Sequence, residues 1–147
     1  MRSFTLADWT TIRGQGTSSG SPSQVTQDET LWLDLEEHSD VVIYLDVSEV
    51  TAPGGTVTFF FETAPSKDDP RDPTTNAPLF FQTLASVALS AATSSTVVLR
   101  ALMSTATVPL ARYLRWRAAG PTGMPNPTWD ATFRALVSAN GARHVRK

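Results

Sequence analysis

The sequence predicts an all-β fold: a single antiparallel β-sandwich, jelly-roll-like, with eight or nine strands and long polar loops. Apolar residues recur at every second position in many short segments, which is typical of strands that bury one face. Turns rich in glycine and proline separate these segments at regular intervals. The 147 residues also suffice for one domain, residues 1–147, to bury a core without help from a disulfide or a metal.

The clearest strands lie near the C-terminus, at residues 111–119 and 129–138. Each segment alternates between an apolar face and a polar face, as a half-buried strand does. A stretch rich in glycine and proline, residues 120–127, can only be a loop. We therefore expect the two segments to form a hairpin that closes the sandwich, with Trp116 and Trp129 in the core.

The polar faces of these two strands carry arginines, namely Arg115, Arg117 and Arg134. Such a face resembles a surface for nucleic acid. Acidic residues, however, also take outward positions on predicted strands, at Asp46, Glu62 and Asp130. We expect cross-strand ion pairs between the two sets, because opposite charges on neighbouring strands stabilise a sheet.

The other predicted strands, in chain order, cover residues 3–9, 31–35, 41–47, 56–63, 79–85, 87–91 and 96–101. Residues 56–63 are apolar on both faces near the middle, which indicates a central strand. Trp32 alternates out of phase with the leucines around it, so its side chain is expected to be exposed or to face a partner. A short helix competes with the last of these strands at residues 99–104.

Three segments are too polar to form a core. Residues 13–30 are rich in glycine, serine and threonine, and we expect an extended polar segment that lies over a surface or a partner. Residues 64–78 contain four prolines, which exclude a helix or a central strand. Residues 140–147 form a basic C-terminal tail, either frayed or docked on an acidic neighbour.

No combination of residues predicts catalysis. The absence of cysteine excludes disulfides, thiolate metal sites and cysteine nucleophiles. His38 and His144 have no partners in the sequence for a catalytic triad or a zinc site. The sequence also lacks a nucleophile elbow and a phosphate-binding loop. We predict a protein that is not an enzyme, with no catalytic residue, no cofactor and no metal site.

An acidic cluster in the proline-rich loop is the one candidate for a cation site. Asp68, Asp69 and Asp72 could bind Ca²⁺ through their carboxylates. Their spacing fits no EF-hand loop, and Lys67 and Arg71 neutralise much of the charge. A solvated loop is the better interpretation.

Charge and hydropathy limit the possible partners. The net charge of −2 argues against a nucleic-acid coat, for which a basic domain is expected. No apolar run approaches the ~20 residues of a membrane span, and the N-terminus lacks the apolar region of a signal peptide. We expect a protein made in a cytoplasm, with no nucleic-acid partner and no membrane partner.

Four segments together suggest a family. Phe-Phe-Glu-Thr-Ala-Pro-Ser at 60–66, Phe-Gln-Thr-Leu at 81–84, Ala-Arg-Tyr-Leu-Arg-Trp-Arg at 111–117 and the strand at 129–138 resemble small β-sandwich virion proteins of tailed bacteriophages. The resemblance covers residues 31–139. Ala64 and Ser66 depart from the commonest turn residues of those proteins, and the loop after them is longer and richer in proline.

The resemblance implies a structural role in a bacteriophage virion, most of all that of a capsid decoration (cement) protein that stabilises the assembled head. A component of the neck, tail or fibre is the alternative within the particle. The implied partners are the major capsid protein or other virion proteins, together with further copies of the chain in a homo-oligomer. A different class is a carbohydrate-binding β-sandwich module for host adhesion, which would use exposed tryptophans. A small hydrolase would need a carboxylate pair such as Glu36 and Asp46, and the spacing does not favour one.

Residues in the polar segments and the exposed aromatics are the candidate partner contacts. They are Trp9, Arg13, Trp32, Asp68, Asp69, Arg71, Asp72, Arg143, Arg146 and Lys147.

Overall fold

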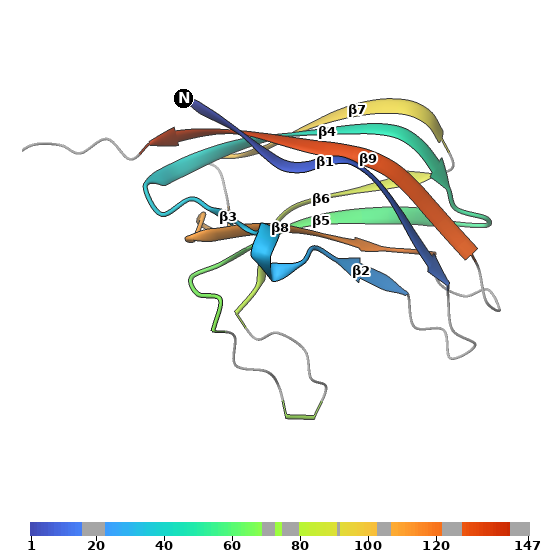
Figure 1. Ribbon diagram of the computed structural model, residues 1–147, viewed down its shortest axis with the longest axis horizontal. Helices are drawn as coiled ribbons and strands as arrows, with labels where there is room; N and C mark the ends of the chain where they lie inside the picture. The colour runs from blue at the N-terminus through green and yellow to red at the C-terminus, as the bar shows by residue number, and fades with distance from the viewer. Residues whose placement is uncertain are drawn as a thin grey trace, which may run out of the picture.

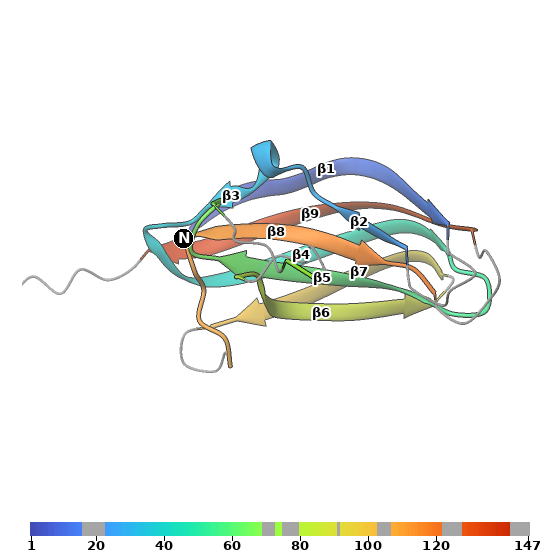
Figure 2. The ribbon, with the colours of Figure 1, turned by 90° about the horizontal axis from the view of Figure 1, so that it is seen from below.

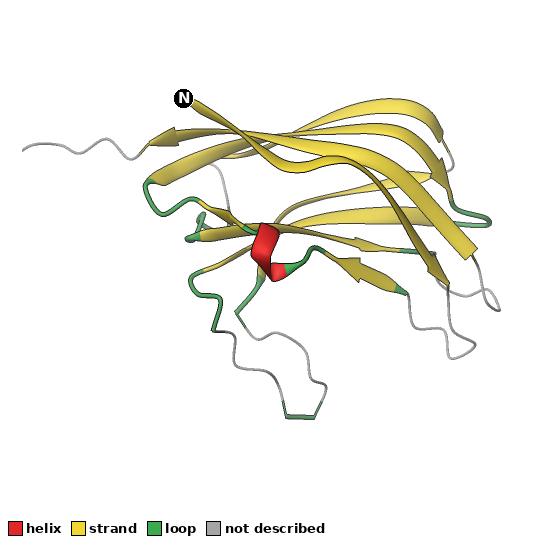
Figure 3. Ribbon diagram, in the orientation of Figure 1, coloured by secondary structure: helices red, strands yellow, loops and turns green. Residues whose placement is uncertain are grey.

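The protein is a sandwich of two antiparallel sheets in the computed structural model, which describes residues 1–15, 23–68, 73–74, 80–90, 92–102, 107–121 and 128–141 (Figure 1). Sheet A has the strand order β1 (Arg2–Gln15), β9 (Thr128–Gly141), β4 (His38–Thr51) and β7 (Ala92–Ala101). Sheet B has the order β2 (Gln24–Thr26), β8 (Tyr113–Ala119), β5 (Thr56–Ala64) and β6 (Gln82–Ser90), and β3 (Leu33–Asp34) also pairs with β8. The one helix in the described part of the chain is the 3₁₀ turn η1 (Glu29–Leu31) (Figure 3).

The strand order is that of a jelly roll. The chain passes from one sheet to the other after β1, β3, β4, β6, β7 and β8, and pairs consecutive strands directly only at β5 and β6. Strands β2 and β3 share the same side of β8, so the described strands occupy eight positions, four in each sheet. The predicted all-β jelly-roll sandwich is confirmed.

The predicted C-terminal hairpin is wrong, because β8 belongs to sheet B and β9 to sheet A. Alternation tells which face of a strand is apolar, but it does not tell whether two such strands lie side by side or face each other across a core. Here they face each other: the rings of Trp116 and Phe133 meet edge to face at 5.0 Å between the two sheets. The prediction that Trp116 and Trp129 are core residues is confirmed, at 6% and 0% exposure.

Aromatic side chains fill the centre of the sandwich. Phe59 and Phe61 of β5 and Phe133 of β9 are fully buried, and the rings of Phe59 and Phe133 lie 4.9 Å apart. The indole N–H of Trp129 donates to the hydroxyl of Ser23 at 2.6 Å, so its polar atom is satisfied. Each such side chain contributes about 1.5–3 kcal/mol by leaving water.

The polar segment 13–30 is more structured than expected. It contains the end of β1, the short strand β2 and the start of the turn η1, while residues 16–22 lie outside the described part. The expectation that this composition contributes nothing to the core is wrong at Gln27, which is 5% exposed. The reason is that hydrogen bonds can replace apolar contacts at a buried position.

Several boundaries also differ from the prediction, and β1, β4 and β7 are longer than predicted. The strand expected at 31–35 shrinks to β3, because residue 31 belongs to η1. The strands expected at 79–85 and 87–91 are a single strand, β6. The helix considered for 99–104 is wrong as far as β7 extends, to Ala101, and residues 103–106 lie outside the described part.

Candidate interaction surfaces

A charge cluster on the outer face of sheet B consists of Glu62 from β5 with Arg115 and Arg117 from β8. Oε2 of Glu62 accepts from Nε of Arg115 at 2.9 Å, and Nη2 of Arg115 also lies 2.9 Å from it. Oε1 accepts from Nε of Arg117 at 2.8 Å, and Nη2 of Arg117 lies 2.7 Å from it. The side chains of Glu62 and Arg115 are each 7% exposed. One buried carboxylate thus pairs with two guanidinium groups, and the three side chains together keep one net positive charge.

Aromatic rings cover this charge cluster. The guanidinium carbon of Arg115 lies 3.4 Å from the ring centre of Phe81 and 5.3 Å from that of Trp32, and the two rings meet edge to face at 4.9 Å. The indole N–H of Trp32 donates to the carbonyl of Gln27 at 3.2 Å. Trp32 is therefore half-buried and engaged within the chain, which argues against its use as a sugar platform.

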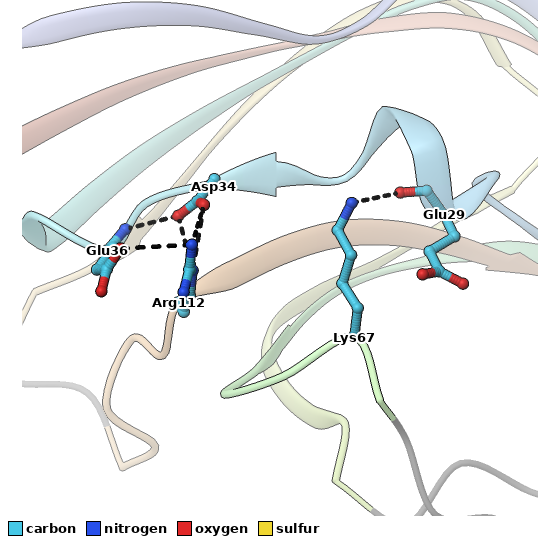
Figure 4. A network of polar contacts seen from close by, with 5 residues as sticks. All are labelled: Glu29, Asp34, Glu36, Lys67 and Arg112. Carbon is cyan, nitrogen blue, oxygen red and sulfur yellow. Dashed lines mark hydrogen bonds and ion pairs between the residues drawn. The ribbon is translucent and has the colours of Figure 1, made fainter.

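A second polar network lies at the edge of sheet B that β3 forms (Figure 4). Arg112 donates from Nη2 to Oδ2 of Asp34 at 2.9 Å and lies 3.4 Å from Glu36. The hydrogen bond from Arg112 holds the pKa of Asp34 below its ordinary value of 3.8. Close by, Nζ of Lys67 donates to the carbonyl of Glu29 at 3.2 Å. These contacts tie β3 and η1 to the segments that precede β8 and follow β5.

The side chain of Gln27 links sheet A to sheet B through hydrogen bonds. Its side-chain nitrogen donates to the carbonyls of Leu6 at 2.7 Å and Leu31 at 3.1 Å, and its side-chain oxygen accepts from the backbone N–H of Trp116 at 3.1 Å. Leu6 lies at a register shift of β1, where the pairing with β9 is interrupted. The sequence analysis did not identify Gln27. The only signal was its spacing of two residues from Val25, which places both side chains on the same side of an extended chain.

A groove of about 400 Å³ lies beside Gln27, between β1 and η1. Its lining includes Leu6, Asp8, Thr10, Asp28 and Trp116, and contains no histidine, cysteine or lysine. The carboxylate of Asp28 caps η1, and the hydrogen bonds that it accepts from the hydroxyl and the N–H of Thr30 lower its pKa from 3.8.

The outer face of sheet A carries an ion pair and exposed apolar side chains. Arg134 donates to Asp46 at 3.0 Å and lies over the ring of Trp9 at 5.1 Å. Beside this pair, Leu136 of β9, Tyr44 of β4 and Val98 of β7 are register partners, and all three are exposed, at 37%, 38% and 42%. We call these three residues the apolar row. Sequence reasoning missed it, because only the register places its members side by side.

The expected cross-strand ion pairs are confirmed for Glu62 and Asp46. Asp130 instead lies opposite Arg13 in the pairing of β1 with β9. Arg115 and Arg117 lie on β8, in the other sheet, and Arg134 lies on β9 itself, so none of the three is a cross-strand neighbour of Asp130.

The structure places the predicted contact residues in different surroundings. Trp9, Arg13 and Asp68 are exposed, and Trp32 is packed as described. The backbone N–H of Asp68 donates to the hydroxyl of Ser66 at 3.0 Å. The other six, Asp69, Arg71, Asp72, Arg143, Arg146 and Lys147, lie outside the described residues. Contact with a partner stays a prediction for all ten.

Two searches of the described residues bear on other classes of site. No three of their histidine, aspartate or glutamate side chains come together in a way that could hold a metal ion. Within the same residues, no helix has the length and apolar character needed to cross a bilayer.

The structure is thus a jelly-roll β-sandwich whose buried charged side chains, Glu62 and Arg115, form an ion pair. No protein-family model matches the chain, and no curated protein matches it in sequence. Among solved structures, the chain is similar to one in the structure of infectious bursal disease virus, Gx strain, with a TM-score of 0.54 and 14% identity over 98% of this chain and 32% of that one. A chain in the structure of the Gt strain gives 0.52 and 13% identity, over 92% and 32%. The chain spans about a third of the length of these neighbours. At such identity the likeness establishes the fold.

Proposed function

We propose that the chain is a non-enzymatic structural protein of a virus particle, and specifically a decoration protein on the head of a tailed bacteriophage. The observation that carries this proposal is the jelly-roll fold, which is similar over 98% of the chain to a chain of a virus structure. The bacteriophage assignment rests on the resemblance of segments 60–66, 81–84, 111–117 and 129–138. Since folds host many functions, the proposal needs a direct test.

The mechanism we propose is stabilisation by mass action. A protein that binds the assembled shell and not its free subunits shifts the equilibrium toward the shell. The surfaces we assign to this contact are residues 1–30, the 64–78 loop and residues 140–147. Trp9 is the described residue best suited to anchor it, because aromatic side chains dominate binding energy at interfaces and its side chain is 47% exposed.

The test is the protein composition of purified particles. Quantitative mass spectrometry is expected to find this chain in a fixed ratio to the major shell protein. A few copies per particle would contradict decoration and support a neck, tail or fibre component. Absence from the particles would overturn the virion role altogether.

Thermal stability of the shell gives the second test. Shells that lack this chain are expected to melt at higher temperature once the purified chain is added. Trp9→Ala is expected to weaken this effect, while Phe80→Ala is the matched control, since Phe80 is an aromatic of similar exposure, 46%, outside the assigned contacts. Equal effects of the two variants would contradict the role of Trp9.

A further inference from the structure

The edge strands on the two long sides of the sandwich differ in length and regularity (Figure 2). Strands β1, β2 and β3 lie along one side, and β6 and β7 along the other. On the first side, two register shifts interrupt β1, and β2 and β3 have only three and two residues. Bulges and short strands are the usual means by which proteins prevent edge strands from pairing with other chains.

Strand β7 lacks these protections. It runs for ten residues, Ala92–Ala101, pairs with β4 without a register shift, and contains no proline, no glycine and one charged residue, Arg100. Within the described residues its only strand partner is β4. No other described strand pairs with its outer row of N–H and C=O groups, which is the kind of edge that accepts a further strand. By contrast, the pairing of the neighbouring edge strand β6 is irregular opposite Phe61 and Glu62.

Both faces of β7 also leave apolar surface uncovered. Val97 and Leu99 point into the sandwich, yet they are only half-buried. Their register partners on β4, Leu45 and Ile43, are 0% exposed. On the outer face, Val98 ends the apolar row. A strand added beside β7 would remove apolar area from water on both faces, which favours association.

We propose that β7 pairs antiparallel with β7 of a second copy of this chain, about a two-fold axis, so that two A sheets form one continuous eight-stranded sheet. A two-fold contact brings a strand against itself, so the strand must not repel its own copy. Strand β7 meets this condition: any axis between Ser95 and Leu99 places Arg100 opposite an uncharged residue. With the axis at Val97, Thr96 faces Val98 of the other copy and the two Val97 residues face each other, and such cross-strand pairs are favourable.

This pairing adds a contact between copies to the proposed structural role, and its biological purpose rests on that role. It extends the apolar row of one copy into that of the other, and gives a dimer two identical outer faces. The two ideas fail separately, because the pairing is measured in solution and the virion role on particles.

Distances between spin labels test the pairing directly. The chain has no cysteine, so Val98→Cys and Leu136→Cys each give one labelling site on the same face. In the proposed dimer, residue 136 lies two strands further from the axis in each copy, so its label pair is expected to be longer by about 19 Å, four inter-strand spacings of ~4.8 Å. Equal distances at the two sites would overturn edge pairing and indicate that the faces stack.

Association in solution provides the matched comparison. Sedimentation of the full chain is expected to show a dimer, and Val98→Lys to weaken it at least ~10-fold through like charges near the axis. Leu136→Lys, at a similarly exposed site away from the edge, is expected to leave the dimer intact. A monomeric wild-type chain at about 100 µM, where micromolar association would be complete, overturns the proposal, as does equal weakening by both variants. Particles that contain a chain monomeric in solution would overturn the pairing alone.

Discussion

Replacement of Glu62 by glutamine tests whether buried charge pairing holds the outer face of sheet B. The substitution preserves the shape of the side chain and removes its charge. It also presents an amide N–H₂ to one of the two guanidinium groups, where both partners are donors. Arg115, with a side chain 7% exposed, then loses its ion pair with Glu62.

The expected cost follows from burial. Removal of one partner of a buried ion pair costs about 3–5 kcal/mol. Arg117 is less buried, at 18% exposure, and can regain water after the change. We therefore expect Glu62→Gln to lower the free energy of unfolding by about 3 kcal/mol, at the low end of that range.

Urea denaturation at pH 7, followed by tryptophan fluorescence, measures this change. Asp46→Asn is the matched control: it removes the same kind of carboxylate–arginine pair, but its side chains are 29% and 40% exposed. Pairs at the surface contribute about 0–1 kcal/mol. If the two variants lose the same stability, burial does not set the strength of the Glu62 cluster and the reasoning is refuted.

Three further substitutions probe other contacts. Gln27→Leu is expected to cost about 2–4 kcal/mol in urea denaturation, because it leaves two carbonyls and one N–H without their partner; a loss below about 1 kcal/mol would contradict the bridging role. Gly120→Ala is expected to lower the melting temperature measured by calorimetry, because a Cβ there would overlap the buried indole of Trp129; an unchanged melting temperature would show that the indole can move. Asp34→Asn is expected to reduce stability at pH 7 and to lose this effect in acid: the hydrogen bond from Arg112 holds the folded pKa of Asp34 below 3.8, so the contribution is present above that value and lost as pH falls through the folded pKa. A pH-independent difference between wild type and Asp34→Asn would exclude the ion pair as its cause.

The sequence patterns predicted which face of each strand is buried, but they did not predict which strands lie next to each other. Alternation placed Trp116 and Trp129 in the core, and outward charges indicated that Glu62 would pair with arginines. The pattern could not tell that β8 and β9 belong to opposite sheets, since each strand alternates in the same way in either arrangement. Which strands neighbour each other depends on contacts distant in the sequence, and single-strand periodicity contains no such information.

The surfaces were less accessible to sequence reasoning for a related reason. Leu136, Tyr44 and Val98 are each an ordinary apolar residue at an outward position, and only the register makes them a row. Gln27 has a polar side chain in a polar segment, so its burial depends on a carbonyl in β1 and an N–H in β8. Properties that arise from the meeting of three distant segments have no local signature.

The position of β9 has a consequence for how the chain folds. This last strand lies between β1 and β4, so the first and fourth strands have no direct pairing with each other and must wait for residues 128–141 to join them. During synthesis on a ribosome, sheet A stays open along its middle until the final strand has emerged. Pairing over such sequence separations slows folding, and the unpaired edges of β4 and β1 that face β9 stay exposed to other chains during that time. Loss of β9 would therefore divide sheet A in two rather than trim its edge.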